Sequence, residues 1–176
     1  DDKVYSPGTV IISAAGEVKN IRKIVSPVLA YIKGTYLYYI DFSFDTFKLG
    51  GSAFAQTLGK LGEEVPTVKD SEYFKNAFGA VQELLDRGLI LAGHDVSAGG
   101  LITAMLEMCF ANPLGGLEAR LDKLHHSDLI KILFAENPGV LIQVKHHHLV
   151  EKILEDYGLG YAIVARPTEN RKITIQ

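Results

Sequence analysis

Residues 88–110 read Gly-Leu-Ile-Leu-Ala-Gly-His-Asp-Val-Ser-Ala-Gly-Gly-Leu-Ile-Thr-Ala-Met-Leu-Glu-Met-Cys-Phe and join two different apolar patterns. The run 88–92 is short, apolar and preceded by a polar turn, which is typical of a buried strand. From Leu101 onward the apolar side chains recur at helical spacing, so a helix is predicted to begin near Gly99. A strand that passes into a helix through a glycine-rich turn is a common place for a phosphate group and its metal ion.

The turn itself carries one carboxylate, Asp95, one hydroxyl, Ser97, and the glycines Gly99 and Gly100. Glycine lets backbone N–H groups approach a ligand closely, but a carboxylate beside them would repel a bare phosphate. A phosphate that arrives with Mg²⁺ suits this combination, because the cation binds oxygen ligands of both kinds. The spacing therefore predicts a magnesium-nucleotide site. In the alternative interpretation, Asp95 or Ser97 caps the helix and the glycines only form the turn.

The remaining pattern mixes strands and helices without the strict alternation of a doubly wound sheet, which predicts an α+β fold with helices packed on a mixed sheet. The last two predicted strands are close enough in sequence to pair as a hairpin. Besides 88–92, the predicted strands are 8–15, 35–41, 117–121, 139–144, 160–165 and 171–176. The predicted helices are 52–61, a long helix capped by Asp70 or Ser71, the helix from Gly99, a short helix capped by Ser127, and 147–157.

The composition is typical of a globular protein, and the 176 residues are expected to form one domain, 1–176. A net charge of −3 argues against nucleic-acid binding, and no apolar stretch approaches the roughly 20 residues that span a bilayer. The single cysteine, Cys109, lies on the apolar face of a predicted helix, where packing is its expected role. One cysteine suits a reducing compartment, so a cytoplasmic location is expected. The chain begins with Asp1 and its first predicted strand follows at once, so we expect a piece of a longer enzyme.

Several segments resemble the formylglycinamide ribonucleotide amidotransferase family, also called phosphoribosylformylglycinamidine synthases. The segment 94–110 is similar to the family's HDxSxGGL…AEMAFA stretch. Further resemblances run in the same order along nearly the whole chain: 6–14 with SPLSLVISAFA, 38–41 and 49–56 with LLIDLG…LGGSALAQ, and 134–144 with FNEELGAVIQV. Where the family often shows HDRSDGG, this chain has Val96 and Ala98 in place of the arginine and the second aspartate.

The resemblance implies an AIR-synthetase-related C-terminal domain, from the second of two synthetase-like modules in the large, single-chain form of the enzyme. It implies an ATP- and glutamine-dependent carbon-nitrogen ligase of purine biosynthesis, in which ATP activates the formyl amide and ammonia displaces the phosphate. In this lobe, Asp95 would bind Mg²⁺ and Ser97 would contact ATP or ADP, at an auxiliary rather than catalytic site. The partners would be the first lobe of the module and the glutaminase domain, which holds the nucleophile outside this chain. No catalytic residue is expected here.

Two alternatives stay open at this point. The first is that the chain comes from a different ATP-dependent enzyme of the same superfamily, such as aminoimidazole ribonucleotide synthetase, thiamine-phosphate kinase or selenophosphate synthetase. The second is that it is a non-enzymatic scaffold in which the turn at Asp95 only caps a helix.

Several other polar positions have no assigned ligand. The turn 50–52, Gly-Gly-Ser, is more typical of a plain helix N-cap than of a phosphate contact. For Glu136 and for Asp41 we expect a structural role. His94 could orient Asp95 or simply be a satisfied, partly buried histidine. The adjacent histidines 146–148 cannot all bind one ion, because consecutive helical residues point about 100° apart.

Overall fold

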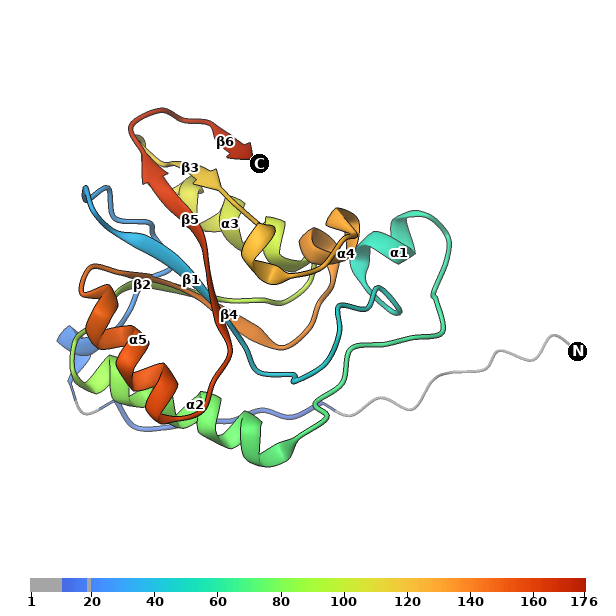
Figure 1. The fold of residues 1–176 in the computed structure, drawn as a ribbon, viewed down its shortest axis with the longest axis horizontal. Helices are drawn as coiled ribbons and strands as arrows, with labels where there is room; N and C mark the ends of the chain where they lie inside the picture. Colours follow the sequence, from blue (N-terminus) through green and yellow to red (C-terminus); the bar gives the residue numbers. More distant parts are fainter. Residues whose placement is uncertain (1–10, 19) are drawn as a thin grey trace, which may run out of the picture.

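Strand β1 (Tyr36–Asp41) lies inside the sheet, and its four central residues are buried. Leu37 and Tyr39 belong to one hydrophobic cluster, whereas Tyr38 and Ile40 belong to a second cluster on the opposite face. Successive side chains of a strand point to opposite faces, so β1 must be covered on both. The computed structural model, which describes residues 11–18 and 20–176, shows this three-layer arrangement (Figure 1).

The six strands of the sheet occur in the order β2-β4-β1-β5-β3-β6. All neighbouring strands are antiparallel except β3 and β6, which are parallel, so the prediction of a mixed sheet is confirmed. The other strands are β2 (Ile90–Asp95), β3 (Gly116–Ala119), β4 (Gly139–Val144), β5 (Tyr161–Thr168) and β6 (Ile173–Ile175).

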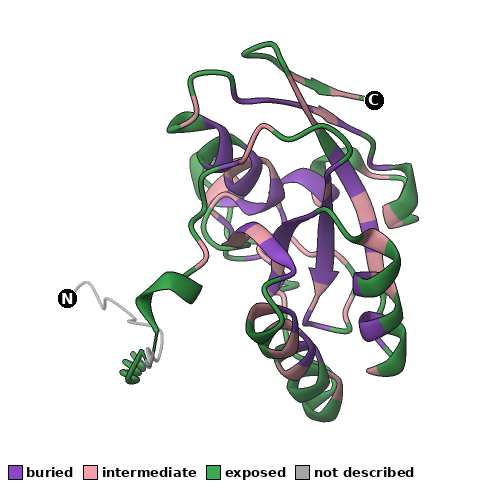
Figure 2. Ribbon diagram, turned by 90° about the vertical axis from the view of Figure 1, so that its left-hand side faces the viewer, coloured by how far each residue is buried: buried purple, intermediate pink, exposed green. Residues whose placement is uncertain are grey.

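Helices pack on this sheet, as predicted, and they cover both of its faces. On one face lie α2 (Ser71–Asp86) and α5 (His147–Asp156), and on the other lie α3 (Gly100–Phe110) and α4 (Leu129–Phe134) (Figure 1). The short helix α1 (Ala53–Thr57) lies beside α4, where the rings of Phe54 and Phe134 stack with centroids 4.6 Å apart. The inner faces of the helices are buried and their outer faces exposed (Figure 2). Two 3-10 turns complete the described elements: η1 (Ile21–Lys23) and η2 (Asp122–Leu124).

The predicted hairpin at the C-terminus is wrong. Strand β6 pairs with β3 rather than with β5, because β3 lies between them in the sheet. Strands β5 and β6 run in opposite directions and are close in sequence, but they are not neighbours in the sheet, so their short separation in sequence was misleading.

Several predicted boundaries also differ, and strand β2 runs over Ile90–Asp95 rather than 88–92. Residues 8–10 of the predicted first strand lie outside the described residues, and residues 11–15 form no strand, with Ile11 and Ile12 87% and 85% exposed. Strand propensity needs a neighbouring strand to pair with, and no strand of the described sheet pairs with this segment. Helix α1 ends at Thr57 rather than near residue 61, and Asp128 rather than Ser127 caps α4, since its carboxylate accepts from Ile130 and Lys131 N–H.

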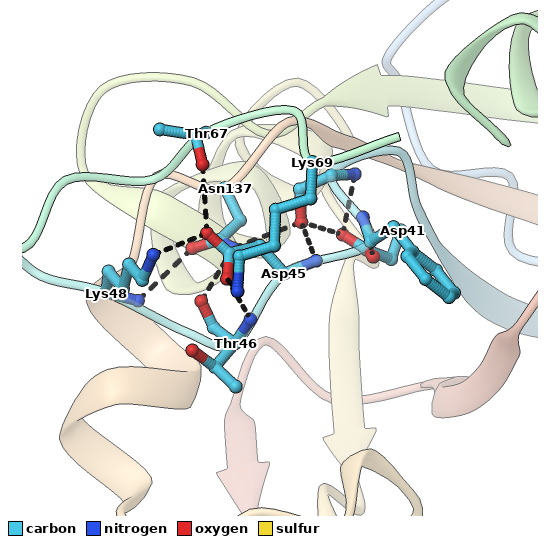
Figure 3. Close-up of polar contacts among 9 residues, drawn as sticks. Asp41, Asp45, Thr46, Lys48, Thr67, Lys69 and Asn137 are labelled. Atoms are coloured by element: carbon cyan, nitrogen blue, oxygen red, sulfur yellow. Dashed lines mark hydrogen bonds and ion pairs between the residues drawn. The ribbon is translucent and has the colours of Figure 1, made fainter. Parts of the chain in front are cut away.

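Asp45 anchors the loop that leads from β1 to α1 (Figure 3). Its side chain is 0% exposed and forms ion pairs with Lys48 Nζ at 2.7 Å and Lys69 Nζ at 2.6 Å. The carboxylate also accepts hydrogen bonds from Thr46 N and Thr67 Oγ1. Burial by itself raises the pKa of the Asp45 carboxyl, but the bonds from Lys48 and Lys69 outweigh it and hold that pKa well below its ordinary range.

Asn137 ties the same loop to the start of β4. Its Nδ2 donates to Ser43 Oγ at 3.2 Å and to the Thr46 carbonyl at 3.1 Å, and its Oδ1 accepts from Lys48 N at 3.3 Å (Figure 3). A buried amide that satisfies both its donor and its acceptor atoms specifies the loop conformation closely.

Gly100, the first residue of α3, is required by both its backbone angle and its surroundings. Its φ is +75°, and a Cβ there would lie 2.7 Å from the Leu133 carbonyl oxygen and 2.8 Å from backbone atoms of Phe134. The end of α4 therefore packs directly on the glycine backbone.

No helix in the described part of the chain is long and apolar enough to cross a membrane.

We predict that Gly100→Ala lowers the free energy of unfolding by about 3 kcal/mol, since it adds a backbone clash to an unfavourable φ. Gly158→Ala is the matched control: Gly158 has a φ of +70° but nothing within 4 Å of the added Cβ. The control should cost only about 1 kcal/mol. Urea unfolding of both variants measures the difference, and equal losses would show that α4 can move away at no cost.

We predict that Asp45→Asn lowers the free energy of unfolding by about 2 kcal/mol at neutral pH, because two charged hydrogen bonds lose their carboxylate. Because the folded-state pKa of Asp45 is depressed, its contribution is complete above the unfolded-state pKa and is lost as the pH falls through the folded-state pKa. The difference between wild type and variant should therefore shrink below about pH 4. Asp156→Asn, at an exposed carboxylate on α5, controls for the change in charge. A difference that does not depend on pH would contradict the ion-pair account.

Candidate functional site

Asp95 and Ser97 lie where strand β2 passes into helix α3. Asp95 is the last residue of β2, at the edge of the sheet, and its side chain is 75% exposed. Ser97, two residues later in the connecting loop, is also exposed. The structure thus places Asp95 at the end of β2, rather than in the turn, and Ser97 in the short loop that follows, and both residues are exposed.

Neither side chain caps α3. The N-cap residue is Gly99, which has a φ of +89° and no side chain that could accept a capping hydrogen bond. The Gly99 N–H instead donates to Glu136 Oε1 at 2.8 Å. The capping interpretation of Asp95 and Ser97 is therefore wrong for this structure. Both residues are exposed, and Asp95 Oδ1 lies 3.6 Å from His94 Nδ1.

Glu136 joins two helix N-termini that are far apart in sequence. Besides Gly99 N–H, its Oε1 accepts from the N–H of Ala53, the first residue of α1, also at 2.8 Å. The first N–H groups of a helix have no partner within the helix and carry partial positive charge, so a carboxylate is a favourable acceptor for them. Glu136 supplies one internal anion to both helices.

The turn 50–52 is fully occupied by internal hydrogen bonds. Gly50 N–H donates to the Glu64 carbonyl, Gly51 N–H to the Leu61 carbonyl, and Ser52 N–H to the Leu49 carbonyl. The Ser52 hydroxyl oxygen accepts from Ala55 N–H, which makes it the N-cap of α1. The geometry therefore favours the N-cap interpretation of this turn over a phosphate contact.

His94 connects β2 to α3. Its Nδ1 lies 2.7 Å from the Asp95 carbonyl oxygen and its Nε2 lies 2.9 Å from Glu107 Oε2, on α3. The side chain is only 15% exposed. Both ring nitrogens therefore have partners within the protein, and His94 holds the backbone of Asp95 rather than presenting a nitrogen to a ligand.

A cavity of about 310 Å³ opens beside Asp95. Its walls are mainly apolar and come from α2, β2, β4 and the segment before β1, including Val81, Ile90 and Ile142. Ligand cavities are commonly apolar with a few polar groups that fix orientation. Here His94 and Asp95 are the polar groups at its margin.

The described residues include no cluster of three or more His, Cys, Asp or Glu side chains that could hold a metal ion. A closed, all-protein metal centre is therefore absent from this part of the chain. One exposed carboxylate does fit Mg²⁺ that arrives with a nucleotide, because this ion keeps several waters and uses one or two carboxylates together with phosphate oxygens.

The sequence interpretation favoured a structural role for Glu136, which its two hydrogen bonds bear out, but it missed Asn137 and Asp45. All three are polar residues in loops, and each has at least one partner between 22 and 94 positions away along the chain. The only local signal was the polar pair Glu136-Asn137 between an apolar helix and an apolar strand.

Residues 45–176 match the family described as AIR synthase related protein, C-terminal domain. A probable phosphoribosylformylglycinamidine synthase of Caenorhabditis elegans is 36% identical over 170 residues, which cover 89% of this chain and 13% of that protein. The human phosphoribosylformylglycinamidine synthase is 37% identical over 161 residues, which cover 90% of this chain and 12% of that protein. The chain thus spans about an eighth of the length of these relatives.

Among solved structures, PurL of Thermotoga maritima complexed with ATP superposes with a TM-score of 0.66 at 18% identity, over 89% of this chain and 25% of that one. At this identity the likeness concerns the fold, which agrees with the mixed sheet and its two helical layers. The family match covers three quarters of the sequence, including both predicted site residues and Glu136. The chain belongs to the family of AIR synthase related C-terminal domains.

Proposed function

We propose that this chain is one lobe of a phosphoribosylformylglycinamidine synthase and contributes Asp95 and Ser97 to an auxiliary magnesium-nucleotide site. The observation that carries the proposal is the identity of 36% and 37% to two relatives of that name, across nine tenths of this chain. Assignment to another enzyme of the superfamily is less well supported, because both relatives carry the name phosphoribosylformylglycinamidine synthase. A scaffold with no ligand would not require an exposed carboxylate and hydroxyl on the strand-to-helix loop.

The proposed whole enzyme uses ATP and glutamine-derived ammonia to convert the formyl amide of its ribonucleotide substrate into an amidine. Bound Mg²⁺ would neutralise phosphate charge at this lobe. The chain's own contribution is positional: the Asp95 carboxylate supplies one oxygen ligand, and the Ser97 hydroxyl supplies a hydrogen bond to the nucleotide. The apolar cavity beside Asp95 has room for part of the nucleotide out of water.

The proposal includes partners that lie outside this chain. The relatives are about eight times as long as this chain. In the proposed enzyme, residues 1–176 act as one lobe, and the first lobe of the module and a glutaminase domain would be its partners. A cytoplasmic location is part of the proposal, and the buried free thiol of Cys109 suits a reducing compartment.

We predict that Mg-ADP, at about ten times its Kd, raises the thermal midpoint of this chain by about 3 to 5 °C. Asp95→Asn should abolish that rise while leaving the midpoint of the ligand-free protein nearly unchanged, since the exposed carboxylate makes no helix cap. Asp156→Asn, at a remote exposed carboxylate, should keep the rise. A rise that persists in Asp95→Asn would remove Asp95 from the site, and no rise in wild type would show that this lobe alone does not hold the nucleotide.

A further inference from the structure

We propose that a second cavity, where β1 ends and β5 begins, binds a small aromatic or heterocyclic anion. This cavity has a volume of about 500 Å³, against about 310 Å³ for the cavity beside Asp95, and the two share no lining residue. Cavities of a few hundred cubic ångströms are the usual size of small-molecule sites. The inference does not depend on the function proposed above.

The two carboxylates at this cavity are used by the protein itself. Asp41 Oδ1 accepts from Ser43 N and Oγ, and Asp41 Oδ2 accepts from Phe44 N at 2.8 Å. The buried Asp45 carboxylate forms ion pairs with Lys69 and one further lysine (Figure 3). A cation that entered the cavity would therefore find both carboxylates already bonded.

Hydrogen-bond donors, in contrast, are left over. Lys69 Nζ lies 2.6 Å from Asp45 Oδ1 and forms no other ion pair with the described residues, so part of its donor capacity is free. Lys123 lines the cavity, is exposed and forms no ion pair within the described part of the chain. The Tyr73 hydroxyl oxygen accepts from Gly160 N–H at 3.0 Å, while its hydrogen has no acceptor among the described residues. Free donors and positive charge suit an anion.

Tyr39 supplies separate evidence for a ligand. The residue is only 4% exposed, yet its hydroxyl forms no hydrogen bond of normal length and angle with any described residue. No fully buried polar side-chain atom in residues 11–18 and 20–176 lacks a partner, so this hydroxyl must reach the cavity that Tyr39 lines. Burial, and then the charge of Asp41, raises the pKa of the hydroxyl far above its ordinary range. It therefore stays a protonated donor at neutral pH.

The walls beside these donors are aromatic. Phe44 and Phe47 line the cavity together with Leu124. The ring centroids of Phe44 and Tyr73 are 4.8 Å apart, and those of Phe47 and Tyr39 are 6.3 Å apart. Aromatic side chains offer a ligand ring offset and edge contacts. A flat ring with one anionic group, a carboxylate or a phosphate ester, therefore matches both the walls and the donors.

Titration of the isotope-labelled chain with benzoate, followed by amide chemical shifts, tests the site. Benzoate should shift the signals of residues 44–47 and 158–162, with a Kd on the order of millimolar for so small a ligand. Benzamide, its neutral isostere, and acetate, which lacks the ring, should bind about tenfold more weakly. In a parallel titration, tighter binding of phenyl phosphate would assign the site to phosphate esters, and tighter binding of benzoate would assign it to carboxylates. Equal binding of benzamide, or no shift with either aromatic anion, would overturn the inference.

Variants of the donors test the assignment of residues. Tyr39→Phe should raise the Kd for benzoate about tenfold, and Lys123→Ala about threefold, with thermal midpoints close to that of wild type because neither group is bonded to described residues. Tyr161→Phe is the matched control: Tyr161 lines the same cavity, but its hydroxyl donates to Glu155 Oε1 at 3.1 Å, so benzoate binding should not change. Lys60→Ala, at an exposed lysine outside the cavity, controls for the loss of charge. Unchanged affinity in both donor variants would contradict the proposed site.

Discussion

One carboxylate, that of Glu136, organises the loops at this end of the molecule. It accepts N–H groups from the first turns of α1 and α3, whose sequences are more than 40 residues apart. Leaving such N–H groups buried without a partner is costly, so the two helices are joined by the electrostatics of a single side chain. The adjacent Asn137 extends the junction to the loop that carries Asp45.

Two glycine-rich turns, at 50–52 and 97–100, have several of their N–H groups bonded within the protein. All three N–H groups of the first turn bond to nearby carbonyls, and in the second turn Gly99 N–H bonds to Glu136 and Gly100 N–H to the Ser97 carbonyl. Glycine also permits close packing, because a Cβ on Gly50 would clash with the Glu64 carbonyl oxygen. The polar atoms left for a ligand are those of Asp95 and Ser97, on the outer side of the loop. In the proposed site, ligand binding would therefore depend on a cation more than on helix N-termini.

Local patterns in the sequence determined much of the fold. The apolar run before Gly93 and the helical spacing after Gly100 correctly predicted a strand followed by a helix, although β2 extends to Asp95 rather than ending at residue 92. The long α2 helix was also predicted, and of its two candidate caps, Asp70 and Ser71, the structure selects Asp70. The same local information predicted that Asp95 and Ser97 lie close together between the strand and the helix.

Only the tertiary structure decided which distant groups meet. The pairing of β6 with β3, the lack of a strand at 11–15, and the capping of α3 by Glu136 all depend on neighbours that are remote in sequence. Strand propensity and a lone acidic residue carry no record of their partner, because pairing and hydrogen bonding are set by three-dimensional proximity. The sequence by itself therefore determined most of the helices and strands and the candidate ligand residues. The tertiary structure decided which helix N-terminal N–H groups are hydrogen-bonded within the protein.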